Sequence, residues 1–210
     1  MLQDSECAMK DSETTRSTKA DKEIKRYICQ GKEFLEKQEI ATAEWYFRMG
    51  LKEIDRHYRP NILRFCYYML FRYNYYAEDA SQETFIAVLK QLKKFDINTN
   101  ISSWLHGIAR HKCVDILRMI KSHKFVPIYE DYEDSHFGIP ESYCETLEHL
   151  NIMLSKLTNR ERAVFIQSYI ENMSSEEIAR SLNIVNINSY HKVAERLRKK
   201  IEQIWKEIES

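Results

Sequence analysis

The chain has 210 residues, with 32 basic and 32 acidic side chains, so its formal net charge is zero and identifies no class of partner. Apolar residues make up 43%, enough for packed cores, whereas the chain contains only 4 glycines and 3 prolines. Since period-two runs of Val and Thr are also absent, composition favours an all-α fold over a sheet.

The 5 cysteines are isolated and form no CxxC pair. This spacing argues against a disulfide framework and against a structural zinc site, so we expect no metal and a reducing, cytoplasmic location. No apolar run approaches ~20 residues, so we expect no membrane span. Residues 1–20 are polar and lack the apolar core of a signal peptide, which indicates a disordered tail.

Residues 21–52 predict a pair of helices broken near Gln38–Ile40. One such pair cannot bury its own apolar face. We expect this N-terminal extension to pack on the domain that follows, with binding of a regulator as the alternative. Its pattern resembles half of a tetratricopeptide-like hairpin, through Gly31, Phe34, Ala43, Tyr46, Phe47, Gly50 and Leu51.

Residues 53–124 predict a long helical block, interrupted at Tyr73–Tyr76 and at Asp96–Asn100. The helix AEDASQETFIAVLK, residues 77–90, carries two distinct faces. Positions i, i+3, i+4 and i+7 form an acid–amide face of Asp79, Gln82, Glu83 and Ile86. An apolar stripe on another side consists of Phe85, Leu89 and Leu92. Packing against neighbouring helices does not require the acid–amide face.

The stretch ISSWLHGIARHKCVDILR, residues 101–118, combines apolar residues at helical spacing with several cations. Cations neutralise phosphates, and rings accept unstacked bases. The candidate nucleic-acid contacts are Trp104, Arg110, His111, Lys112 and Arg118. Core packing of Trp104 is an equally good interpretation. We expect His111 on the exposed basic face rather than at a metal, since no second ligand has suitable spacing.

Residues 125–146 are acidic, contain Pro127, Gly138 and Pro140, and indicate a flexible linker. Residues 147–207 predict helices again, with two capping boxes that start helices: Thr158 with Glu161, and Ser174 with Glu177.

A short helix, a turn and a basic helix then form a helix-turn-helix pattern. Ala179 suits the close approach of its helices, and Asn183 tolerates the left-handed backbone that the turn needs. The outward side of the basic helix carries His191, Lys192, Glu195, Arg196 and Lys199. The alternative is an ordinary helical hairpin with a solvated basic face.

Residues 58–124 resemble region two of bacterial sigma factors of the sigma-70 family, particularly the extracytoplasmic-function (ECF) type. The resemblance rests on YRPNILRF, AEDASQETF and SSWLHGIARHKCVDILR. Residues 147–205 resemble region four through LSKLTNRERAVFIQSYIENMSSEEIARSL and the basic helix after it. The resemblance implies two small helical domains, residues 53–124 and 147–207, in a promoter-specificity subunit that is not an enzyme and needs no cofactor.

The resemblance also implies residue roles. Asp79, Gln82 and Glu83 would dock on the clamp helices of the largest subunit of core RNA polymerase, while Phe85 and Leu89 hold the helix in its own bundle. Trp104, Arg110, His111, Lys112 and Arg118 would lie on the surface that captures the promoter −10 element, with flipped bases entering near Asp96–Ser102. The residues implied to enter the −35 major groove are Ser189, His191, Lys192, Arg196 and Lys199.

The linker resembles the connector that passes through a basic channel of the polymerase. Whether this chain has an anti-sigma partner stays open. Two rival functions remain at this point. A stand-alone helix-turn-helix transcriptional regulator would bind an operator as a dimer, but it leaves the acid–amide face unexplained. An interaction adaptor built on the N-terminal helices would have no role in DNA binding. We find no nucleophile–base set and no phosphate-cradling glycine loop, so an enzyme is not expected.

Overall fold

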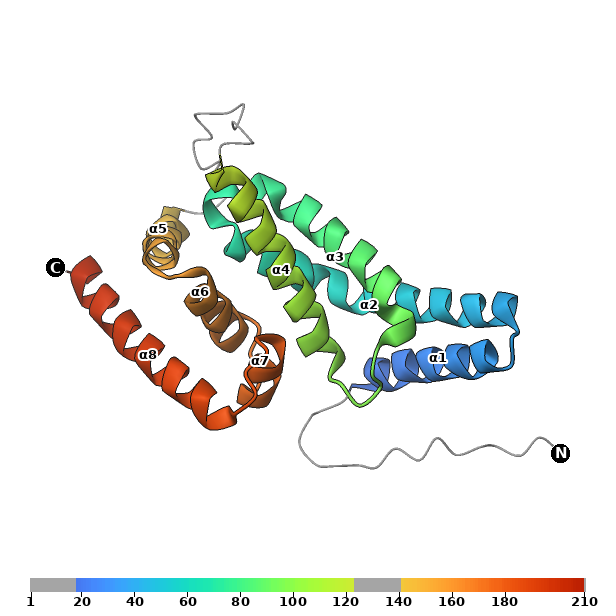
Figure 1. The fold of residues 1–210 in the computed structure, drawn as a ribbon. Coiled ribbons are helices and arrows are strands. Elements are labelled where there is room, and N and C mark those ends of the chain that lie inside the picture. The colour runs from blue at the N-terminus through green and yellow to red at the C-terminus, as the bar shows by residue number, and fades with distance from the viewer. Residues whose placement is uncertain (1–17, 123–140, 210) are drawn as a thin grey trace.

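The structure is a computed structural model that describes residues 18–122 and 141–209, of which 141–147 and 209 are described by backbone alone. Every regular element in these ranges is a helix, which confirms the predicted all-α fold (Figure 1). The α-helices are α1 (Lys19–Glu36), α2 (Ile40–Met69), α3 (Ala77–Gln91), α4 (Ile101–Lys121), α5 (Glu141–Lys156), α6 (Asn159–Phe165), α7 (Ser175–Ser181) and α8 (Ile187–Glu209). Shorter turns of helix are η1 (Phe71–Tyr76), η2 (Leu92–Lys94) and the π-helical η3 (Ile166–Ile170).

Helices α1 to α4 form the first unit, with α2 packed against α1, α3 and α4. Its core includes the fully buried side chains of Ile24, Ile54, Phe65 and Leu105. The predicted helix break near Gln38–Ile40 is confirmed. Helix α2 then runs without interruption across residues 52 and 53, so the N-terminal extension and the first unit share one helix.

Two helix starts differ from the sequence prediction. The tail was expected to reach residue 20, yet α1 begins at Lys19, because Thr18 and Asp21 form a capping box. The linker was expected to reach residue 146, yet α5 begins at Glu141, directly after Pro140. The rest of the predicted tail and the linker residues up to 140 lie outside the described residues.

Helices α5 to α8 form the second unit, in which α8 packs against α5, α6 and α7. Both predicted capping boxes are present, at Thr158 and at Ser174. Asn183 has a φ of 54°, so the helix-turn-helix turn uses the left-handed conformation predicted for it. None of the described helices combines the length and apolar character that crossing a lipid bilayer requires.

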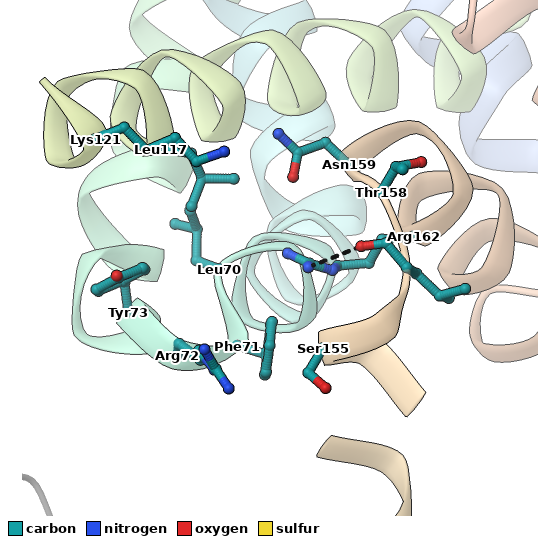
Figure 2. A pocket seen from close by; sticks show the side chains of 11 residues that line it. Leu70, Phe71, Arg72, Tyr73, Leu117, Lys121, Ser155, Thr158, Asn159 and Arg162 are labelled. Carbon is teal, nitrogen blue, oxygen red and sulfur yellow. Dashed lines mark hydrogen bonds between the residues drawn. The ribbon is translucent and has the colours of Figure 1, made fainter. Parts of the chain in front are cut away.

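The two units pack against each other, with α4 on α7 and α2 on α6 and η3. A cavity of about 500 Å³ lies between them, lined by Leu70, Phe71 and Leu117 from the first unit and by Ser155 and Arg162 from the second (Figure 2). The guanidinium of Arg162 lies over the Phe71 ring, 4.5 Å from its centroid. Residues far apart in sequence thus build this boundary.

Candidate polymerase and nucleic-acid interfaces

The acid–amide face of α3 lies at the surface: Asp79, Gln82 and Glu83 are all exposed. The opposite side of α3 is buried, and four of its six buried residues are small, which lets neighbouring helices approach closely. These buried residues are Ala77, Ala80, Ser81, Thr84, Phe85 and Val88. Helix α3 therefore has one buried side and one exposed polar side.

The prediction that Leu89 holds α3 in its bundle is wrong. Leu89 is 52% exposed and Ile86 is 44% exposed, whereas Phe85 and Leu92 are buried as expected. The buried stripe follows Ser81, Phe85, Val88 and Leu92, and Leu89 lies one position beyond its edge. Two apolar side chains consequently flank the acids on the exposed side of α3.

Lys112 of α4 lies next to this acid–amide face. Lys112 Nζ lies 3.2 Å from Glu83 Oε2, which ties α4 to α3 at the surface. Arg118 pairs with Asp115 one turn away at 3.0 Å, and both side chains are exposed. Exposed ion pairs of this kind contribute little to stability, so both cations can exchange partners readily.

Arg110 and His111 interact with each other, and Arg110 Nη2 donates to His111 Nε2 at 3.1 Å. Burial, followed by the neighbouring Arg110, lowers the pKa of His111, so this side chain accepts the bond as a neutral imidazole. His111 is exposed, as predicted. Trp104 is half-buried, with its ring 4.6 Å from that of Phe95. It serves the core and still reaches the surface.

His106, which the sequence analysis did not single out, is fully buried within α4. Its Nδ1 donates to the Ser102 carbonyl at 2.8 Å, and its ring meets Phe65 edge-on. Burial lowers the pKa of His106 and outweighs the carbonyl, Glu171 and Glu177, which raise it; Arg64 adds to the lowering. His106 is therefore neutral in the folded protein.

We expect acid to destabilise the fold through His106. Below the usual histidine pKa of about 6.5, the unfolded chain binds a proton at His106 that the folded state excludes. The free energy of unfolding therefore decreases as the pH is lowered, by at most about 1.4 kcal/mol per pH unit. Urea unfolding between about pH 7 and 5 measures this slope. A His106→Gln variant should show a flatter dependence, and an identical slope in both proteins would contradict the assignment.

The basic side of α8 points away from the second unit. On the opposite side of α8, Tyr190, Leu197 and Ile204 are buried. The predicted groove residues are all exposed: Ser189, His191, Lys192, Arg196 and Lys199. Lys199 pairs with Glu195 at 2.9 Å. An exposed helix face that carries cations fits the major groove of DNA.

Comparison with known proteins agrees with this arrangement. The chain matches the family model for Sigma-70 region 2 over residues 54–122 and that for Sigma-70, region 4 over residues 152–188. It is 30% identical over 169 residues to the ECF RNA polymerase sigma factor SigW of Bacillus subtilis. The aligned region covers 70% of this chain and 86% of SigW. The chain belongs to the sigma-70 family of RNA polymerase sigma factors. It is a sigma factor of the ECF type, which binds core RNA polymerase and promoter DNA and directs transcription initiation.

Other relatives agree with this assignment. RNA polymerase sigma factor YlaC of Bacillus subtilis is 29% identical over 143 residues, covering 64% of this chain and 80% of YlaC. The solved structure of CnrH in complex with the cytosolic domain of CnrY has the same fold, with a TM-score of 0.59 at 19% identity. That likeness covers 89% of this sigma factor and 97% of the CnrH chain.

The region 2 match runs from the second half of α2 through α4, and the region 4 match ends at the start of α8. The acid–amide face and the basic side of α4 therefore both fall in region 2. The groups that join the two units were missed by the sequence analysis, among them Arg64, Asn100 and Glu171. One signal was visible: Gly107 lies inside a predicted helix, where glycine is less favourable than alanine, so close packing of another element at this position was a reasonable expectation.

Proposed function

We propose that this sigma factor grips core polymerase through the acid–amide face of α3. The observation that carries this proposal is the exposure of Asp79, Gln82 and Glu83 beside Ile86 and Leu89, on a helix whose other side is buried. Exposed acids steer association with a basic partner, an amide fixes register, and the two apolar side chains supply area to bury. We assign the partner as the clamp helices of the largest polymerase subunit.

We further propose that α4 captures the −10 element and α8 reads the −35 element. Trp104 at the surface of α4 offers a ring for an unstacked base, and Arg110, His111, Lys112 and Arg118 supply donors and cations along the same helix. In α8, phosphate contacts would position the helix while base-edge contacts specify sequence. The protein acts without catalytic residues of its own, in the cytoplasm, where core polymerase transcribes.

Transcription in vitro tests the proposal most directly. Purified chain and core polymerase should together initiate at discrete start sites on genomic templates, and neither should do so alone. The alternative, a stand-alone regulator, predicts operator binding without polymerase. A gel-shift with and without core separates the two, because a sigma factor should shift promoter DNA strongly only when core is present.

Lys192→Ala and Arg196→Ala should each weaken transcription that depends on the −35 element. Loss of one base-edge contact costs ~1–3 kcal/mol, and a lost phosphate contact weakens all promoters alike. Run-off transcription on matched templates with intact or scrambled −35 sequence distinguishes these cases.

Lys206→Ala is the matched control, since Lys206 is exposed on α8 about 21 Å further along the helix axis than Lys192. Unchanged promoter selectivity in both groove variants would refute the placement of α8 in the groove.

A further inference from the structure

The charged residues that line the cavity between the two units are all cations. They are Arg72, Lys121 and Arg162, and none of the other lining residues is acidic. Glu161, the one acid of α6, does not line the cavity, and its carboxylate is paired with Lys200 at 2.8 Å. The volume of about 500 Å³ is in the range of small-molecule sites. The cavity therefore has a positive potential that no lining carboxylate offsets.

Two of these cations contact one aromatic ring. The guanidinium of Arg162 lies 4.5 Å from the centroid of Phe71, and that of Arg72 lies 5.7 Å from the same centroid. A ring face attracts cations but carries no net charge that could neutralise them. After burial, the charge of Arg72 is the second cause that lowers the pKa of Arg162, as expected for neighbouring cations. An anion placed beside both guanidinium groups would relieve this repulsion.

Hydrogen-bond donors also meet at this cavity. Figure 2 shows the side chains of Lys121 and Asn159 extending into the same space, with the guanidinium of Arg162 nearby. Arg162 Nη1 carries two N–H groups, one of which donates to the Met69 carbonyl at 2.7 Å. Among the described residues, the other N–H has no acceptor. An ammonium, an amide and a guanidinium around one space suit a ligand that presents several acceptor oxygens.

We propose that this cavity binds a small phosphorylated anion, whose phosphate oxygens contact Arg72 and Lys121. A phosphate group accepts hydrogen bonds both from the planar fork of an arginine and from the ammonium of a lysine. A diphosphate carries enough negative charge for three cations, whereas a single carboxylate would leave two of them unmatched. Arg162 forms the buried side of the site and keeps its carbonyl contacts. Such a site is separate from the polymerase and promoter contacts proposed above.

Isothermal titration calorimetry of the full chain with inorganic pyrophosphate tests the site. We expect saturable binding of one pyrophosphate per chain at low ionic strength. Arg72→Glu and Lys121→Glu should each weaken this binding at least about tenfold, since each removes an attraction and adds a repulsion. Both side chains are exposed, so the variants should fold, which circular dichroism checks. Arg72→Gln removes the charge without reversing it and should cause a smaller loss in the same direction.

Lys52→Glu in α2 and Lys206→Glu in α8 are the matched controls, since both lysines are exposed, lie outside the cavity lining and undergo the same change of charge. Both should bind pyrophosphate within about twofold of the natural chain.

A second titration with ATP identifies the source of the phosphate groups. Equal affinities would mean that the site recognises phosphate alone, and tighter binding of ATP that Arg72→Glu also weakens would mean that it takes a nucleotide. The site is overturned if pyrophosphate does not bind at millimolar concentration, or if the controls lose as much affinity as Arg72→Glu and Lys121→Glu. Displacement of bound pyrophosphate by an equimolar mixed-sequence single strand would assign these cations to nucleic acid and overturn the small ligand.

Discussion

Asp79→Arg should abolish co-purification of this sigma factor with core polymerase while leaving its fold intact. Asp79 is exposed in the first turn of α3, where a carboxylate is compatible with the helix dipole but no buried contact depends on it. The substitution places a cation where a basic partner surface is expected. Affinity for core should fall at least about 30-fold, the effect of losing one desolvated charge contact and adding a repulsive one.

Glu44→Arg is the matched control for Asp79→Arg, since Glu44 is an exposed acid in the N-terminal half of α2 and undergoes the same change of charge. Affinity capture with tagged core measures binding, and circular dichroism checks helix content. The docking assignment fails if Asp79→Arg is retained on core like the natural chain. It fails equally if Glu44→Arg loses binding to the same extent, because net charge alone would then explain the effect.

Local signals in the sequence predicted local structure well. A capping box joins a side chain to a backbone N–H three residues away, so Thr158 with Glu161 and Ser174 with Glu177 are legible without any tertiary information, and both are confirmed. Asn183 is confirmed for the same reason, since the left-handed conformation is a property of one residue. The exposed acid–amide face was also visible, because charged side chains rarely bury unpaired.

Burial at the edge of a helix stripe was not predictable in the same way. Leu89 has the spacing of a core residue relative to Phe85, yet the small side chains Ala80, Ser81 and Thr84 draw the neighbouring helices to one side of α3. The positions of α2 and α4 therefore decide which side of α3 is buried. The ion pair between Arg64 and Glu171 could not be predicted for a related reason: it joins residues 107 positions apart, and no periodicity encodes such a contact.

Arg162 shows how far tertiary structure can depart from a local pattern. It lies in the first turns of α6, where an arginine is ordinarily solvated, yet the residue is only 7% exposed. Its guanidinium donates to the carbonyl oxygens of Leu154, Leu157 and Met69, the last from the first unit. Burial, and then the charge of Arg72, lower its pKa to about 10. At neutral pH Arg162 therefore stays charged. Three backbone carbonyl oxygens accept its hydrogen bonds, in the role that a carboxylate has in an ion pair.

Arg162→Met should destabilise the second unit by about 3 kcal/mol, because three carbonyls lose a donor at about 1–3 kcal/mol each while removal of a buried charge offsets part of the loss. Arg162→Lys keeps the charge but cannot reach all three oxygens, since an ammonium lacks the planar fork of donors. We expect Lys to fail to rescue stability. Urea unfolding followed by circular dichroism measures both variants. A natural midpoint for Arg162→Lys would mean that charge, rather than the geometry of the donors, is what the site between the two units requires.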